Sequence, residues 1–166
     1  MSNGEQFREA MRRMASTVCL VTAIDAAGRP VGLASTSVVS LSLAPPTLLT
    51  CVNRTSSAWP VLAEAALFGV NLLRRDQVDA VRPFMTGQGR LTRFQDERWS
   101  LEDGAPLLRG AQAAVLCCAT ERLAHTTHTI LVGEARLIWT ADEIEPLLYL
   151  DGAFVGEPLL PVPGAA

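Results

Sequence analysis

The sequence has no concentrated positive charge, no visible export signal and no long apolar run. Its 166 residues carry a formal net charge of −3 at pH 7, and no basic run or basic, aromatic-studded stripe occurs. Nucleic-acid binding is not expected, because it depends on clustered cations that neutralise phosphates. The first residues lack a charged segment followed by an apolar core, and the apolar runs are strand-sized. We therefore expect a cytoplasmic protein that binds neither nucleic acid nor membrane.

Cysteine and histidine are scarce, and their spacing does not suggest a metal site. The four cysteines, Cys19, Cys51, Cys117 and Cys118, lie inside apolar runs. Two of them are adjacent, so in a strand they point to opposite faces. Without an export signal they are interpreted as reduced core thiols, and no bound metal is expected.

Several common catalytic and nucleotide-binding motifs are also missing. There is no G-x-S-x-G segment of the kind that carries a hydrolase nucleophile. The one glycine-marked segment, residues 87–92, lacks a third glycine and a preceding strand, so it is neither a Rossmann fingerprint nor a P-loop. Any nucleotide must be held in another way.

Short β-branched and apolar runs separated by turn signals dominate the chain. Strands are predicted at residues 18–23, from Pro30 onward, and at 47–52, 67–72, 111–123 and 129–140. Residues 147–155 are predicted to hold a last short strand or pair of strands around Asp151-Gly152. The first two form a hairpin around residues 25–28. Six to eight strands without βαβ alternation favour a mainly β fold, a closed or partly open barrel with two or three short peripheral helices.

Helices are predicted in three places between these strands. The first contains Phe7, Ala10, Met11 and Met14 at helical spacing, with a capping box formed by Ser2 and Glu5. The second starts with Pro60 and runs to about residue 66. The third starts after Asp76 as N-cap, runs to about residue 81, and is ended by Pro83. Residues 85–98 are expected to be a loop.

One domain is expected over residues 1–155. The segment 156–166 is rich in proline and is expected to be an irregular tail.

Residues 34–42 hold five hydroxyl side chains among apolar ones, and Pro45–Pro46 follow them. A flavin needs donors along its polar edge, an apolar wall for its ring and donors for its phosphate. Ser35, Thr36 and Ser37 on a strand, followed by three polar residues before a helix, offer such donors; the three are Asn53, Ser56 and Ser57. The alternative interpretation is that these serines face water or belong to a turn.

The two histidines, His125 and His128, fall in one predicted loop. A neutral imidazole there is placed to contact a nicotinamide or a flavin edge and to donate a hydrogen bond. The alternatives are a surface or capping histidine, or a metal ligand.

A series of short motifs occurs in a definite order along the chain. They are Phe7–Met11, Val21-Thr22, Gly32 leading into Ser35–Ser42 and Pro45-Pro46, Cys51-Val52-Asn53 with Ser56, Pro60-Val61-Leu62, Phe68–Leu72, Pro106-Leu107-Leu108 with Gly110, Thr127–Ile130 with Val132-Gly133-Glu134, and Pro146–Tyr149. With these motifs, residues 7–149 resemble the flavin reductase-like family with the FMN-binding split-barrel fold. The resemblance is nearest to reductase components of 4-hydroxyphenylacetate and related aromatic monooxygenases.

That resemblance implies a homodimer with flavin bound near the dimer interface. The residues that it assigns to the flavin ring and ribityl chain are Ser35, Thr36, Ser37 and Val38. Those that follow along the same flavin are Cys51, Val52 and Asn53, and those that meet its phosphate are Ser56 and Ser57. An aromatic near the flavin falls at Phe84, and the nicotinamide side falls at His128. The chain departs from the family pattern in three places. Ala34 stands where threonine is usual, and Val39 stands where a small polar residue is common. After Tyr149, where the family often places a basic residue before an aromatic, the chain reads Leu150-Asp151-Gly152-Ala153-Phe154.

The predicted function is an NAD(P)H-dependent flavin reductase that passes reduced flavin to a partner monooxygenase by transient transfer. FMN and FAD both remain open as the flavin, and NADH and NADPH as the hydride donor. The main alternative is a flavin-binding module without turnover. An oxidase related to pyridoxamine-phosphate oxidases would need a cluster of arginines and lysines near the ring, which the sequence does not show.

Overall fold

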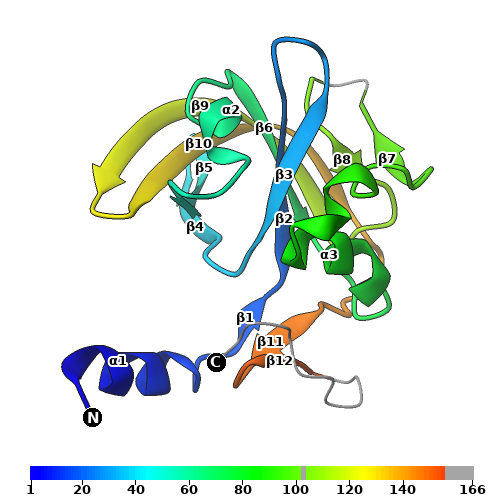
Figure 1. Cartoon of the computed structure of the whole chain (residues 1–166). Helices are drawn as coiled ribbons and strands as arrows, with labels where there is room; N and C mark the ends of the chain where they lie inside the picture. Colours follow the sequence, from blue (N-terminus) through cyan, green and yellow to red (C-terminus); the bar gives the residue numbers. More distant parts are fainter. Residues whose placement is uncertain (102–103, 156–166) are drawn as a thin grey trace.

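Seven antiparallel strands form the main sheet in the computed structural model, which describes residues 1–101 and 104–155. Their order is β3–β2–β6–β9–β10–β5–β4, and the sheet curves round on itself (Figure 1). The mainly β fold with peripheral helices is confirmed. The tail predicted for residues 156–166 lies outside the described residues.

The strands of the main sheet are β2 (Cys19–Ile24), β3 (Pro30–Ser35), β4 (Val39–Leu43), β5 (Pro46–Asn53), β6 (Leu67–Leu72), β9 (Ala113–His125) and β10 (His128–Thr140). The short strands are β1 (Ser16–Thr17), β7 (Trp99–Ser100), β8 (Leu107–Leu108), β11 (Leu148–Leu150) and β12 (Ala153–Phe154). The helices are α1 (Asn3–Met11), α2 (Trp59–Leu62), α3 (Val78–Met85) and the 3-10 turn η1 (Gln88–Leu91).

Most strand predictions are confirmed, and the largest difference concerns the histidines. Strands β9 and β10 pair over almost their whole lengths, so His125 and His128 are the last and first residues of two strands rather than loop residues. The connecting turn is only residues 126–127, with Thr126 at a φ of 47°. Strand pairing therefore fixes the positions of both histidines.

Two helix predictions were wrong in their limits. Helix α3 starts after Gln77 instead of Asp76, and Pro83 lies inside it rather than ending it. The proline removes one backbone hydrogen bond, but the next residue, Phe84, is buried in a core cluster, and this packing keeps the last turn helical. Helix α2 is a single turn, shorter than predicted.

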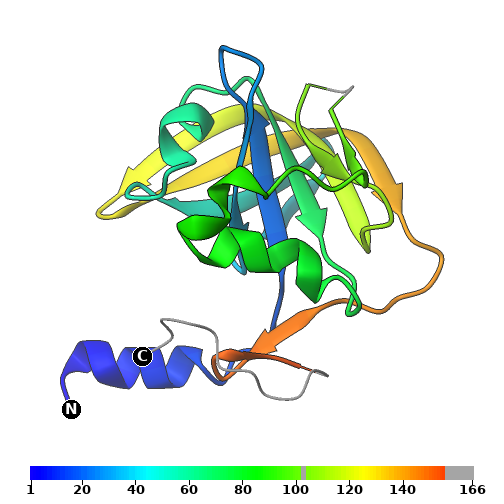
Figure 2. The same ribbon diagram turned by 45° about the vertical axis from the view of Figure 1, so that its right-hand side comes forward.

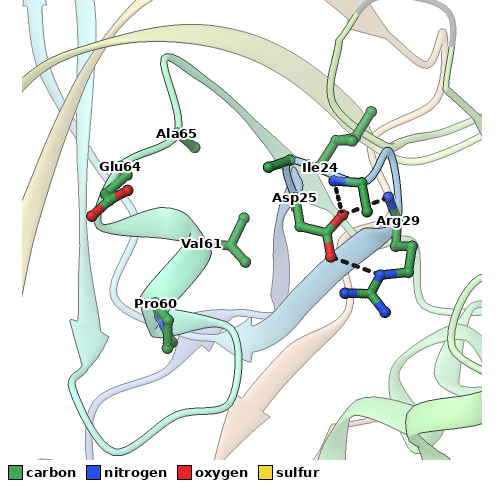
Figure 3. Close-up of a pocket in the computed structure, with 9 residues that line it drawn as sticks. Ile24, Asp25, Arg29, Pro60, Val61, Glu64 and Ala65 are labelled. Atoms are coloured by element: carbon green, nitrogen blue, oxygen red, sulfur yellow. Dashed lines mark hydrogen bonds and ion pairs between the residues drawn. The ribbon is translucent and has the colours of Figure 1, made fainter.

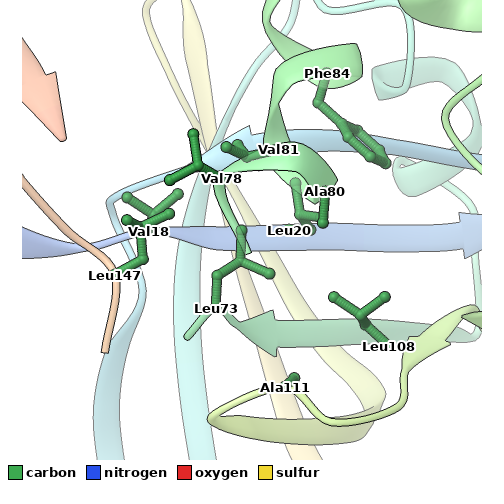
Figure 4. Close-up of a cluster of buried hydrophobic side chains, with 10 residues drawn as sticks. All are labelled: Val18, Leu20, Leu73, Val78, Ala80, Val81, Phe84, Leu108, Ala111 and Leu147. Carbon is green, nitrogen blue, oxygen red and sulfur yellow. The ribbon is translucent and has the colours of Figure 1, made fainter. Parts of the chain in front are cut away.

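Strand β2 is buried on both faces, which explains its uninterrupted apolar sequence. Val18, just before the strand, and Leu20 pack into a cluster beneath α3, which lies across this face of the sheet (Figure 4). Cys19 and Val21 face the opposite way, into the barrel interior. Because successive strand residues alternate between faces, one strand joins the two core regions.

Helix α1 has the predicted capping box, yet no residue of it is buried. It lies apart from the barrel, beside the small sheet β1–β11–β12 (Figure 2). Arg12, at its end, pairs with Asp151 of the β11–β12 turn at 2.8 Å. The acidic residue that departs from the family pattern thus holds the N-terminal segment to the last hairpin.

A buried hydrogen-bond network ties the loop before β9 to the sheet. The Asn71 amide donates to the carbonyl oxygens of Leu20 and Pro106, at 3.2 and 3.3 Å, and its Oδ1 accepts from the Leu108 N–H at 2.7 Å. Thr22 Oγ1 also donates to Pro106, at 2.6 Å. All these side chains are fully buried, so the network satisfies backbone groups that water does not reach.

None of the helices in the described ranges is long and apolar enough to span a bilayer. Within the same ranges, no group of three or more His, Cys, Asp or Glu residues is placed to hold a metal ion.

Replacing Asn71 with leucine keeps the side-chain volume but leaves the Leu108 N–H without its partner. We expect the N71L variant to lose about 2–4 kcal/mol of unfolding free energy, measured by urea denaturation. Gln95→Leu, at an exposed position, is the control and should change it by less than about 0.5 kcal/mol. Equal stability of N71L and the wild type would contradict the role given to this network.

Candidate functional site

The hydroxyl-rich segment joins the end of β3 to β5. Ser37 Oγ accepts the Cys51 N–H at 3.0 Å and lies 3.2 Å from the Cys51 carbonyl oxygen, to which it donates. Ser35 Oγ accepts the Ser37 N–H and lies 2.9 Å from Ser37 Oγ and 3.4 Å from Thr50 Oγ1. The structure therefore brings Ser35, Ser37 and Cys51 together. It also shows that the two serine hydroxyls are already engaged within the protein.

Residues 36–38 connect β3 to β4 and belong to neither strand. The Thr36 side chain is exposed, whereas Val38 packs against the interior cluster. Two of the residues predicted at the flavin ring thus differ in accessibility. Thr36 presents its hydroxyl to solvent, and Val38 anchors the segment in the barrel interior.

Cross-strand pairing places several candidate residues on one face of β5 and β10. His128 is opposite Asn53, and Ile130 is opposite Cys51. Paired residues of antiparallel strands share a face, so these four side chains lie on the outer face of the barrel. Val52 points the other way and is fully buried, so only its backbone is available to a ligand.

The polar loop after β5 is a compact turn built by its own side chains. Asn53 Oδ1 accepts from the Thr55 N–H and hydroxyl, both at 2.9 Å, and Ser56 Oγ accepts the Ala58 N–H at 3.3 Å. The amide NH₂ of Asn53 and the hydroxyl proton of Ser56 remain as donors. The turn interpretation and the binding interpretation of these residues are therefore compatible.

His128 is exposed at the start of β10, and its Nδ1 lies 2.9 Å from Thr127 Oγ1. Arg54 supports the same turn, because its N–H donates to the Thr127 carbonyl oxygen at 2.9 Å. The imidazole is thus held beside Asn53, with its Nε2 edge directed away from the Thr127 contact.

Two hollows flank strand β3. The first, which we call the aromatic hollow, has a volume of about 240 Å³ and is lined by Val18, Ala34, Ser35, Thr36, Val81, Met85, Tyr149 and Phe154. The second, which we call the arginine hollow, has a volume of about 400 Å³ and is lined by Asp25, Arg29, Pro30, Val31, Gly32, Ser57, Ala58, Arg90, Arg93 and Phe94. Ser57 thus lies in a different hollow from Ser35.

A third hollow of about 520 Å³ separates the β2–β3 turn from α2 (Figure 3). Asp25 and Arg29 line it on one side, and Pro60, Val61 and Glu64 line it on the other. It contains none of the residues predicted for the site.

Phe84, the aromatic that the family resemblance places near the flavin, lies inside the protein. It is buried on α3 with 7% of its surface exposed, and its ring packs edge-on against Phe94 at 5.4 Å. The guanidinium of Arg93 lies 5.2 Å above the same ring. In this chain the aromatic therefore supports a cation at the arginine hollow, and a direct contact with a flavin stays a prediction.

The four cysteines are free thiols. Burial raises the pKa of Cys19 to about 12, and burial, with a smaller contribution from Cys118, raises that of Cys117 to about 12. These two are neutral core residues at ordinary pH. Cys51 is half-buried beside Ser37 and contributes its backbone to the site.

Sequence reasoning missed Thr50, Ile130 and Arg93. Thr50 and Ile130 belong to strands whose register sets their neighbours, and the sequence alone does not give that register. Arg93 lies in the segment 85–98, which was expected to be a loop, and nothing in its sequence marks this arginine out.

The donors on the outer face fit the polar edge of a flavin. They are the neutral amide of Asn53 and the imidazole of His128, and apolar Ile130 lies beside them on the same face. Three arginines, Arg29, Arg90 and Arg93, line the separate arginine hollow, together with Asp25.

Comparison with known proteins agrees with this geometry. A family model described as flavin reductase like domain matches residues 11–157. "FMN reductase (NADH) RutF 2" of Rhizobium rhizogenes is 37% identical over 148 residues, covering 89% of this chain and 85% of the relative. "FADH(2)-dependent resorcinol hydroxylase, reductase component" of Rhizobium sp. is 32% identical over 148 residues, covering 88% of this chain and 83% of the relative.

A solved structure has the same fold. The Streptomyces globisporus NADH:FAD oxidoreductase SgcE6, in complex with NAD and FAD fragments, superposes with a TM-score of 0.84 at 28% identity, covering 99% of this chain and 96% of that one. The family match spans most of the sequence, and both relatives exceed 30% identity over more than two thirds of their lengths. The chain belongs to the flavin reductase-like family.

Proposed function

We propose that this protein is an NADH-dependent flavin reductase that supplies reduced flavin to a partner monooxygenase. The observation that carries the proposal is the single outer face on which Cys51, Asn53 and His128 are held beside the Ser35–Ser37 segment. The names of the relatives, an NADH-dependent FMN reductase and the reductase component of a hydroxylase, agree with it.

Bound flavin would supply the two-electron acceptor, with hydride passing from C4 of the nicotinamide to N5 of the ring. The chain's own contribution is binding and alignment. Thr36 and Asn53 donate to the polar edge, and Ile130 and Val38 give apolar support. His128 lies at the end of the face, positioned to orient a nicotinamide within the contact distance of about 3–3.5 Å that such transfer needs.

The flavin and the donor follow from the same comparisons. FMN with NADH is the pair named for the Rhizobium rhizogenes relative, and FAD with NADH is named for SgcE6. The open outer face suits a flavin that binds, is reduced and leaves, because no described element covers it. The four free thiols agree with a reducing, cytoplasmic location.

A homodimer completes the proposal. Helix α1 buries no residue, and 66% of the surface of its Phe7 is exposed. The edge strand β4 also exposes apolar side chains: 89% of the Leu43 surface is exposed, and Val39 and Leu41 are exposed as well. Apolar side chains at a free helix and an unpaired edge are unusual for a monomer. We propose that a second copy covers them, and that residues 1–155 form the folded unit that dimerises.

The reductase activity is tested by mixing the purified protein with NADH and FMN without oxygen. We expect the absorbance of the oxidised flavin to disappear, with each protein chain reducing many flavin molecules. Repeating the assay with FAD in place of FMN, and with NADPH in place of NADH, shows which flavin and which hydride donor the protein prefers. Tight FMN binding without any bleaching would instead identify a flavin-binding module.

Replacing His128 with alanine tests the alignment role. We expect NADH-dependent reduction to slow about tenfold or more, while the Kd for FMN changes by less than threefold, because the imidazole serves the nicotinamide side. His125→Ala, at the other end of the same turn, is the matched control and should leave the rate within twofold. An unchanged rate in H128A would remove this residue from the mechanism.

A further inference from the structure

The β9–β10 hairpin ends in an exposed arm that leads directly to His128. The ladder between β6 and β9 stops where Leu67 faces Cys118, and residues 120–127, which we call the hairpin arm, are all exposed. The arm projects from the body of the barrel in both views (Figures 1 and 2). The backbone of His128 is fixed by pairing with β5, but its imidazole contacts Thr127 Oγ1, which belongs to the arm. The direction of the arm therefore affects how the ring of His128 is turned.

A β-bulge bends the hairpin at the base of the arm. Val132 and Gly133 are successive residues of β10, but their partners in β9 are not successive. The partners are Glu121 and Ala119, so Thr120 between them is an extra residue, which bends the strand and increases its twist. The Thr120 hydroxyl donates to the Val132 carbonyl oxygen at 3.3 Å and holds the bend in place. Beyond the bulge, the arm needs a further contact to keep its direction.

Arg122, two residues beyond the bulge, supplies that contact. Its guanidinium donates to the carbonyl oxygens of Ala65 and Leu62, at 2.6 and 3.4 Å. These groups lie at the end of α2 and in the turn that follows it, where carbonyl oxygens need donors from outside the helix. Helix α2 is a firm support, because Ala58 and Leu62 are fully buried. One planar guanidinium therefore ties the exposed arm to the barrel core.

The tip of the arm is held from the other edge of the hairpin, where β5 pairs with β10. The Arg54 N–H donates to the Thr127 carbonyl oxygen at 2.9 Å, and the Arg54 guanidinium donates to the Thr126 carbonyl oxygen at 3.3 Å. The arm is thus held on both sides, by Arg54 at its tip and by Arg122 near its base. Of the two, Arg122 is the one whose side chain lies away from the polar loop after β5.

We propose that Arg122 is a positioning residue for hydride transfer. It fixes the hairpin arm against α2, and Thr127 then holds the imidazole of His128 in the orientation that aligns a nicotinamide. This inference rests on the proposed function. Arg122 touches neither the flavin nor the nicotinamide and acts through His128, so its loss slows the reaction no further than the loss of His128 does.

Arg122→Met tests the proposal, because it keeps the length of the side chain and removes its donors. With NADH and FMN both saturating, we expect the rate of FMN reduction by R122M to fall about fivefold, while the Kd for FMN stays within twofold. Arg122→Lys should keep at least half of the wild-type rate, because an ammonium group can still donate to the Ala65 carbonyl oxygen. Arg136→Met, at an exposed arginine on β10, is the matched control and should keep the wild-type rate.

A double-mutant cycle separates positioning from a general loss of stability. In an H128A background, R122M should change the rate by less than twofold, because the side chain through which Arg122 acts is gone. Hydrogen exchange measures the tether itself, without any substrate. In R122M the amides of residues 121–127 should exchange at least threefold faster than in the wild type, while those of β2 exchange as before.

Three results would each overturn the positioning role and leave the reductase function intact. They are an R122M rate within twofold of the wild type, a fivefold loss that R122M also causes in the H128A background, and unchanged exchange of the arm amides in R122M. A wild-type protein that never bleaches FMN with NADH would refute the proposed function and the positioning role together.

Discussion

The hydrogen bonds between the Ser37 hydroxyl and the backbone of Cys51 are the constraint on which the site depends. The β4–β5 ladder ends where Val39 faces Leu49, and two positions further in the same register Ser37 would face Cys51. The chain turns toward β3 there, and Cys51 would be left with an unpaired N–H and carbonyl group. One hydroxyl satisfies both, avoiding a cost of about 1–3 kcal/mol for each buried group left without a partner.

These Ser37–Cys51 hydrogen bonds give the hydroxyl-rich segment a structural role. The side chains of Ser35 and Ser37 hold β3 against β5, and the segment between the strands is fixed as a result. In the proposed site, a ligand on the outer face would meet a rigid edge whose donors are Thr36, the Asn53 amide and the backbone. A preorganised edge of this kind loses little conformational entropy on binding, which suits a flavin that is exchanged rather than retained.

The sequence predicted the fold class and most strands, because alternation and turn residues are local signals. It predicted the capping box of α1 and the last hairpin around Asp151 for the same reason. It did not predict that α3 continues through Pro83, since the burial of Phe84 depends on residues far along the chain. Nor could it place Arg93 and Ser57 in one hollow, because that meeting depends on the hydrogen bonds that hold Arg93 against Pro83 of α3 and Gly32 of β3. The candidate residues on β5 and β10 were found individually, while their common face required the strand register.

Hydrogen exchange at the Cys51 amide tests the role of the Ser37–Cys51 hydrogen bonds most directly. In the wild type this amide should be protected from exchange, because its N–H donates a hydrogen bond to the Ser37 hydroxyl. In a Ser37→Ala variant its exchange should accelerate about tenfold or more, while amides of β6 exchange as before. Equal exchange of the Cys51 amide in the two proteins would contradict the account.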